Sequence, residues 1–177
     1  MNICVFCSAS DVDAKYTAAA MDLATGIASG GHTLVWGGSD KGTMKVIADA
    51  AQSAGGRIVG VTMELLKAAA RANADEMLIM PTLGERKAKL LERSDAIVVL
   101  PGGLGTLDEI TEVLELKKHS LHDKPVVFLN TADFYAGFKV QLERMDAEGF
   151  LPRALSHLLF FADTPEDAMR YIETHGS

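Results

Sequence analysis

The sequence is poor in cysteine and has no long hydrophobic run, and each absence narrows the class of protein. Cys4 and Cys7 are the only cysteines among the 177 residues, too few for a disulfide framework. No apolar run approaches the ~18 residues that span a membrane, and no basic stretch followed by a long apolar run opens the chain, so we expect neither a membrane anchor nor a signal peptide. We therefore expect a cytoplasmic protein with one domain, residues 1–177, which is long enough to bury a sizeable core.

Basic residues are also scarce, and no metal-binding spacing is present. The chain has 17 Lys+Arg against 24 Asp+Glu, a formal net charge of −7, whereas proteins that neutralise nucleic-acid phosphates present a basic face. We expect no nucleic-acid partner and no membrane partner. Cys4 and Cys7 have C-x-x-C spacing, but they lie in an expected strand, where an odd separation points two side chains to opposite faces. Two core thiols are predicted, not a redox pair or a zinc site.

Short apolar runs alternate with longer amphipathic stretches along the whole chain. The expected strands are Ile3–Cys7, Thr33–Trp36, Arg57–Val61, Met77–Met80, Ala96–Leu100, Val126–Leu129 and Leu158–Phe161. The expected helices are Asp13–Ser29, Gly42–Ala54, Leu83–Arg93, Leu107–Lys118, Asp133–Ala147 and Pro165–Thr174. Several strands are apolar at consecutive positions, as in sheets covered on both faces. The pattern predicts an α/β fold with a doubly wound, mostly parallel sheet of about seven strands, Rossmann-like; residues 64–75 fit either a helix or an irregular crossover.

A glycine-rich turn after the fifth expected strand is the first candidate binding site. In an open α/β sheet, ligands bind beyond the carboxyl ends of the strands, where helix N-termini point free N–H groups outward. Gly102, Gly103, Leu104, Gly105 and Thr106 occupy this place. Their backbone can curl close to a ligand, and the amides with the Thr106 hydroxyl suit a phosphate. The turn has neither the lysine of a P-loop nor a Rossmann G-x-G-x-x-G spacing, and a simple tight corner is the alternative.

Two further segments lie at the same expected edge of the sheet. Gly37-Gly38 and Gly42-Thr43 make a second glycine-rich turn, which is either a ligand contact or a corner that lets a helix pack closely. Arg86 and Lys87 stand near a helix start, where the helix dipole favours negative charge. A cation in that position indicates a carboxylate partner or an anionic ligand, and a solvated surface pair is the alternative.

Two motifs together resemble the signature of the Lonely Guy (LOG) family. The string from Pro101 to Glu109 reads P-G-G-L-G-T-L-D-E and matches the family pattern P-G-G-x-G-T-x-x-E at every fixed position. The segment E-R-K-A at 85–88 precedes it, as in the family, and the opening 5–10, which contains Ser8, is also similar. Thr43 and Lys45 depart from the family, which usually has leucine and glycine there.

The resemblance implies an activity and a set of site residues. Members hydrolyse the N-glycosidic bond of a purine (cytokinin or adenine) riboside 5′-monophosphate to free base and ribose 5-phosphate, in cytokinin biosynthesis, with no cofactor and no metal; acting on AMP, such an enzyme is an AMP nucleosidase. The implied catalytic residues are Glu109, which would stabilise an oxocarbenium-like sugar and orient water, and Arg86, which would hold Glu109 ionised and contact the substrate. The implied substrate- and phosphate-binding residues are Ser8, Gly38, Lys87, Gly102, Gly103, Leu104, Gly105 and Thr106. The implied partners are the small-molecule nucleotide and a second copy of the chain, in a homodimer with the site near the interface.

Three other functions compete with this hypothesis. A carrier of a nucleotide or of molybdenum cofactor, with a similar fold, would bind without turnover. A decarboxylase, as the family was long labelled, would require pyridoxal phosphate on a Schiff-base lysine, and nothing around Lys41, Lys45 or Lys87 marks such a lysine. A nucleoside deoxyribosyltransferase would use the carboxylate as a nucleophile and pass the sugar to another base.

Overall fold

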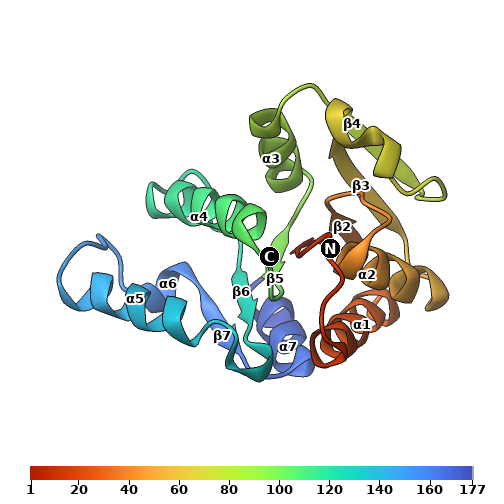
Figure 1. The fold of residues 1–177 in the computed structure, drawn as a ribbon. Coiled ribbons are helices and arrows are strands. Elements are labelled where there is room, and N and C mark those ends of the chain that lie inside the picture. Colours follow the sequence, from red (N-terminus) through yellow and green to blue (C-terminus); the bar gives the residue numbers. More distant parts are fainter. Residues whose placement is uncertain (177) are drawn as a thin grey trace.

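A computed structural model describes residues 1–176, and its centre is one seven-stranded sheet (Figure 1). The strands lie in the order β4-β3-β2-β1-β5-β6-β7, and every neighbouring pair is parallel. Their bounds are Asn2–Phe6 for β1, Thr33–Trp36 for β2, Ile58–Met63 for β3, Glu76–Met80 for β4, Ala96–Val99 for β5, Val126–Leu129 for β6 and Phe160–Ala162 for β7. The predicted doubly wound α/β fold is confirmed.

Helices cover both faces of the sheet, which explains why the strands are apolar at consecutive positions. Helices α1, α2 and α7 pack on one face, and α3, α4, α5 and α6 on the other (Figure 1). Their bounds are Ala14–Ser29 for α1, Gly42–Ser53 for α2, Leu83–Glu92 for α3, Leu104–Lys118 for α4, Ala136–Ala147 for α5, Leu155–Leu158 for α6 and Pro165–His175 for α7; 3₁₀ turns η1 and η2 span Glu64–Ala69 and Thr131–Asp133.

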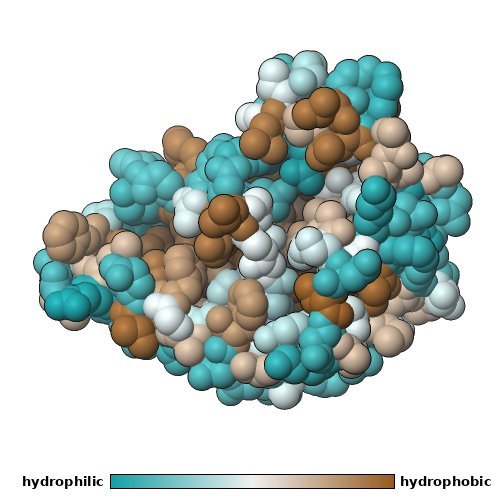
Figure 2. Space-filling model, in the orientation of Figure 1, coloured by the Kyte–Doolittle hydropathy of each residue, from teal (hydrophilic) through white to brown (hydrophobic). Residues whose placement is uncertain are grey.

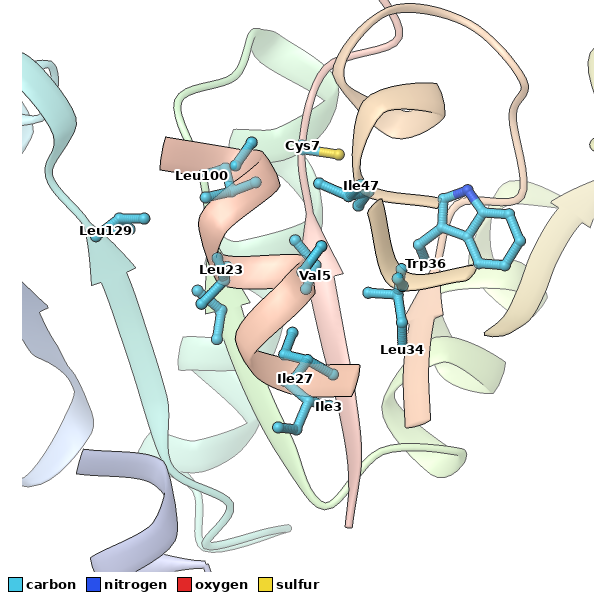
Figure 3. Packing of buried hydrophobic residues seen from close by; sticks show 14 of the residues in the cluster. Ile3, Val5, Cys7, Leu23, Ile27, Leu34, Trp36, Ile47, Leu100 and Leu129 are labelled. Carbon is cyan, nitrogen blue, oxygen red and sulfur yellow. The ribbon is translucent and has the colours of Figure 1, made fainter. Parts of the chain in front are cut away.

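The two sheet faces make two separate hydrophobic cores. In one of them, Leu23 and Ile27 of α1 pack against Ile3 and Val5 of β1 (Figure 3). Cys7 belongs to this core, whereas Cys4 belongs to the core on the opposite face. Both thiols are free and buried, so the predicted pair of core cysteines is confirmed.

The order of the strands fixes where a ligand site can form. Strand β1 pairs with β2 on one side and with β5 on the other. The chain leaves β1 towards α1 on one face and leaves β5 towards α4 on the opposite face. A crevice opens where neighbouring strands send their connections to opposite faces. The loops after Phe6 and Val99 therefore flank the expected site.

Some predicted boundaries are wrong. Helix α4 begins at Leu104 and not at Leu107, because Gly103 takes the N-cap position in extended conformation. The prediction placed the start too late because Gly105, a weak helix former, lies inside the first turn. Strand β7 begins at Phe160 and not at Leu158, because the short helix α6 precedes it. Residues 64–69, in the segment that fitted either a helix or an irregular crossover, form a 3₁₀ turn. None of the described helices combines the length and the apolar character needed to cross a membrane.

Candidate active site

A cleft of about 400 Å³ lies at the carboxyl edge of the sheet, over the junction of β1 and β5. It is lined by Cys7, Ser8, Ala9, Ser10, Met44, Met63, Leu66, Leu83, Arg86, Gly103, Leu104, Gly105, Thr106 and Glu109. Seven of the ten residues predicted from the sequence are among them. The other three, Gly38, Lys87 and Gly102, are not among the lining residues.

The N-terminus of α4 supplies one wall of the cleft. The amides of Leu104, Gly105 and Thr106 lie in the first turn of this helix. Amides in a first turn have no hydrogen-bond partner within their own helix. A Cβ atom on Gly103 or on Gly105 would meet no atom within 4 Å. A Cβ atom on Gly102 would lie 2.2 Å from Oγ1 of the buried Thr106. Packing inside the protein therefore requires glycine at 102, whereas 103 and 105 leave open space for a group that approaches the amides.

Arg86 and Glu109 form a buried ion pair on the adjacent wall. Nη1 of Arg86 donates to Oε1 of Glu109 at 2.6 Å, and each residue is 6% exposed. Two further donors of the guanidinium are held by the backbone: Nε donates to the carbonyl of Val61 at 2.9 Å, and Nη2 to that of Gly37 at 3.5 Å. The pair joins the first turn of α3 to α4, and the carbonyls fix it to two strand ends.

Arg86 occupies the unfavourable end of its helix because tertiary contacts compensate for the helix dipole. Thr82 caps α3 by accepting from the amide of Glu85 at 3.2 Å, and the carboxylate of Glu85 offsets positive charge in that turn. The predicted carboxylate partner of Arg86 is present, and it is Glu109.

Burial raises the pKa of Glu109 above its ordinary value, and the neighbouring Arg86 guanidinium opposes the rise. Desolvation is the larger effect, because the carboxylate has lost nearly all of its contact with water. The site thus presents a carboxyl group whose ionisation depends on a fixed cation beside it.

Lys87 lies on the outer side of the same helix junction. Its Nζ is 2.5 Å from a carboxylate oxygen of Glu112 and 3.1 Å from one of Asp108, both on α4. The hydrogen bond to Glu112 is the main cause of its raised pKa. Lys87 follows Arg86 by about 100° around the helix and therefore turns away from the cleft.

The second glycine-rich turn supports the cleft from behind. Gly38 has a φ of +76° and its carbonyl accepts from the amide of Arg71 at 2.9 Å. A Cβ atom on Gly42 would lie 2.4 Å from the backbone of the loop 8–10, and the carbonyl of Ser8 accepts from the amide of Met44 at 3.1 Å. This turn fixes the position of Ser8 at the cleft.

The two departures from the family pattern lie outside the lining of the cleft. Thr43 is buried, and its hydroxyl has no hydrogen-bond partner within the described part of the chain. The half-exposed Lys45 forms an ion pair with Asp49 at 2.5 Å.

Sequence reasoning missed the apolar wall of the cleft. Met44, Met63, Leu66 and Leu83 supply it, and Leu66 and Leu83 are 51% and 46% exposed. Figure 2 shows separate hydrophobic patches on an otherwise hydrophilic face of the molecule. The signal available in the sequence was the pair of consecutive leucines at 65–66. They lie in the segment 64–75, which fitted either a helix or an irregular crossover.

The fold and cleft define a Rossmann-like protein with a helix N-terminus and a buried arginine–carboxylate pair at the point where the strand order reverses. Comparisons with known proteins give the family. The family described as "Possible lysine decarboxylase" matches residues 44–172. A Mycobacterium tuberculosis protein named cytokinin riboside 5′-monophosphate phosphoribohydrolase is 35% identical over 95% of this chain and 91% of its own length. The Arabidopsis thaliana protein of that name designated LOG1 is 31% identical over 98% and 83%. The chain belongs to this family, the one that the Lonely Guy resemblance indicated.

Solved structures share the fold at lower identity. A molybdenum cofactor carrier protein from Chlamydomonas reinhardtii superposes with a TM-score of 0.76 at 23% identity, covering 98% of this chain and 95% of that one. A molybdenum cofactor binding protein from Rippkaea orientalis gives 0.72 at 21% identity, covering 98% and 95%. At this identity the likeness concerns the fold alone.

Proposed function

We propose that this protein hydrolyses the N-glycosidic bond of a purine riboside 5′-monophosphate, releasing the free base and ribose 5-phosphate. The observation that carries the proposal is the buried pair of Arg86 and Glu109 in the same cleft as the open N-terminus of α4. The relatives named phosphoribohydrolases, at 31–35% identity over nearly the whole chain, support the same reaction.

The phosphate is assigned to the N-terminus of α4. The amides of Leu104, Gly105 and Thr106 point their N–H groups at the open end of the helix, and the helix dipole favours an anion there. Gly103 and Gly105 leave the space that a phosphate needs. Glu109 follows Leu104 by five residues, roughly 7.5 Å along the helix axis, so the ribose lies between phosphate-binding turn and carboxylate.

Glu109 is the proposed catalytic residue. Breaking the bond between C1′ of ribose and the base nitrogen leaves positive charge on the sugar, and a carboxylate beside C1′ stabilises that charge. Water adds its hydroxyl to C1′ and its other proton goes to the departing base. Arg86 keeps the buried carboxylate in place and ionised, and the apolar wall of Met44, Met63 and Leu83 is where the flat purine packs.

The experiment that tests the function is release of free base from a panel of nucleotides. Purified protein is incubated with AMP, N6-isopentenyl-AMP, GMP, CMP and UMP and with adenosine, and released bases are separated by chromatography. We expect release from purine 5′-monophosphates and far slower release from adenosine, because adenosine lacks the phosphate that α4 binds. If none of the nucleotides releases its base, the hydrolase proposal is refuted. Tight binding without turnover would favour the carrier. Sugar transfer to an added second base would indicate a transferase.

The decarboxylase named in the family description receives no support from the cleft. Arg86 is the one cation among the residues described as lining it. Lys45 and Lys87 are held in ion pairs outside the lining. A lysine that carries an imine must face the cleft, and neither of these does.

Replacing Gly105 with alanine should separate the phosphate site from the stability of the fold. Position 105 has open space around its Cβ direction and lies in the first turn of α4, so alanine should leave the thermal midpoint unchanged or raise stability by up to about 1 kcal/mol. The new methyl group enters the space proposed for phosphate, so KM for AMP should rise by tenfold or more. Gly102→Ala is the control: it collides with Thr106 and should cost stability, about 1–3 kcal/mol. Normal KM in Gly105→Ala would place the phosphate elsewhere.

The assembly proposed for this activity is a homodimer in the cytoplasm, with the site near the subunit interface. Leu104, on the rim of the cleft, is 86% exposed. Leu121, which lines a separate groove between α3 and α4, is 71% exposed. Exposed leucines beside a cleft are typical of surfaces that a partner covers. The two free thiols fit a reducing compartment, where disulfides are rare. Sedimentation velocity tests the dimer, and a fully active monomer at assay concentration would exclude it.

A further inference from the structure

A second polar cavity, of about 390 Å³, lies at the opposite edge of the sheet from the cleft. It opens where β6 begins, between the last turn of α4, the last turns of α7 and the short helix α6. The side chains that matter here are Lys117, Asp123, Arg153, His157, Tyr171 and His175. Nothing in the proposed hydrolysis uses them.

Lys117 is a buried cation with little to compensate it. The residue is 5% exposed, and its Nζ donates one hydrogen bond, to the carbonyl of Lys124 at 2.7 Å. An ammonium has three donors, and no carboxylate of residues 1–176 forms an ion pair with this one. Burial lowers its pKa; the charge of Arg153 adds to that effect and Asp123 opposes it.

The other buried cations of the protein are paired, which makes Lys117 an exception. Arg71 has carboxylate oxygens of Asp40 and Asp49 at 2.7 and 2.6 Å, and Arg86 has Glu109 at 2.6 Å. Burying a charge without a partner is costly. A hydrogen bond to one carbonyl explains how Lys117 holds the loop 119–125 in place, but it leaves the charge itself without a counterion.

Arg153 brings a second cationic side chain to the same cavity. Its Nη2 donates to Oγ of Ser120 at 2.7 Å, and within the described range no ion pair involves it. Lys117 and Arg153 face one acid, Asp123, so the cavity carries a net positive charge in a chain whose formal net charge is −7. A cluster of unpaired cations in a protein of negative net charge suits the binding of an anion.

Aromatic rings and two imidazoles complete the cavity. His175 stacks on Tyr171 with ring centroids 4.1 Å apart, and Tyr171 stacks on Phe160 at 4.5 Å. His157 adds a further ring nitrogen. These groups add hydrogen-bonding capacity and a flat wall to the two cationic side chains. The volume exceeds what a bare inorganic ion fills, so the cavity suits a small organic phosphate.

We propose that this cavity binds a phosphate-bearing small molecule, with Lys117 and Arg153 neutralising the dianion and His157 and His175 contacting it. The bound phosphate supplies the counterion that Lys117 lacks. Because Lys117 and Glu109 lie on the same helix, eight residues or about 12 Å apart, occupancy would stabilise the helix that carries the proposed active site.

The test is a titration with inorganic phosphate at fixed pH, observed through the imidazole NMR signals of the five histidines. The signals of His157 and His175 should shift and saturate, and sodium chloride at equal ionic strength should not reproduce the shift. This readout is separate from any phosphate bound at α4, which no histidine lines. Arg153→Gln should weaken binding about tenfold, the loss of one charge-assisted hydrogen bond.

Two comparisons keep the result decisive. Arg144→Gln, in an exposed i,i+4 pair with Glu148 on α5, should leave the phosphate affinity unchanged. Lys117→Met retains the buried stem and removes the charge, and should abolish saturation while far-ultraviolet circular dichroism stays native. Shifts that do not saturate, that chloride reproduces, or that survive Arg153→Gln at full affinity would overturn the proposal.

Discussion

Replacing Glu109 with glutamine is expected to lower turnover of AMP by about 10²–10³-fold while KM changes little. Glutamine keeps the size of the side chain and can still accept from Nη1 of Arg86 through its amide oxygen, so the cleft keeps its shape. It loses the negative charge that stabilises the developing positive charge on the sugar, and removing one such electrostatic group costs about that factor. Single-turnover rates and KM for AMP, measured beside the thermal midpoint, separate chemistry from binding and from folding.

The pH profile provides a second readout for the same residue. Because burial raises the pKa of Glu109, activity that needs the carboxylate should fall on acidification at a pH above the ordinary glutamate range. The free energy of unfolding changes with pH in the opposite direction to activity. A carboxyl group with a raised folded-state pKa binds protons more tightly when folded, so its contribution declines as pH rises from the ordinary value to the raised one. An acid limb of kcat/KM that persists unchanged in Glu109→Gln, or near-wild-type turnover of that variant, would reduce Glu109 to a structural partner of Arg86.

Removing Arg86 should have the largest combined effect on stability and activity. Arg86→Met leaves the carboxylate of Glu109 buried without its partner, and breaking a buried pair from one side costs about 3–5 kcal/mol. The carboxyl group then responds by holding its proton at higher pH, so we expect activity near neutral pH to collapse. Measuring the free energy of unfolding and the AMP hydrolysis rate across pH tests both consequences together.

Three further variants distinguish a positioning role from a general loss of fold. Arg86→Lys keeps a charge but cannot reproduce the fork that reaches Glu109, Val61 and Gly37 together, so rescue should be poor. The double variant Arg86→Met with Glu109→Gln should be less destabilised than the sum of the single changes, because it leaves no uncompensated charge. Lys87→Ala, which removes pairs outside the cleft, should keep its activity. Full activity in a folded Arg86→Met would rule out our assignment.

The fold could be predicted from local patterns because the relevant forces are local or periodic. Consecutive apolar residues in the strands indicated a sheet covered on both faces, and the structure has that sheet. Capping side chains open two of the helices: Asp13 and Thr164 accept hydrogen bonds from backbone amides in the first turns of α1 and α7. Boundaries failed where glycine opened a helix, at Gly103, and where a four-residue helix took the place of a strand start at Leu155–Leu158.

The sequence by itself determined which chemical groups the candidate site contains: the turn 102–106, the carboxylate of Glu109, and Arg86, a cation near a helix start. Only the tertiary structure decided which of these groups meet. Arg86 and Glu109 are 23 residues apart and come from different helices, and their pairing depends on the strand order that brings α3 and α4 together. The same packing turned Lys87 outward and left Lys117 without a counterion. It also made glycine sterically necessary at 102 but not at 103 or 105. Local patterns encode backbone conformation, whereas contacts between side chains of distant segments depend on how whole elements pack.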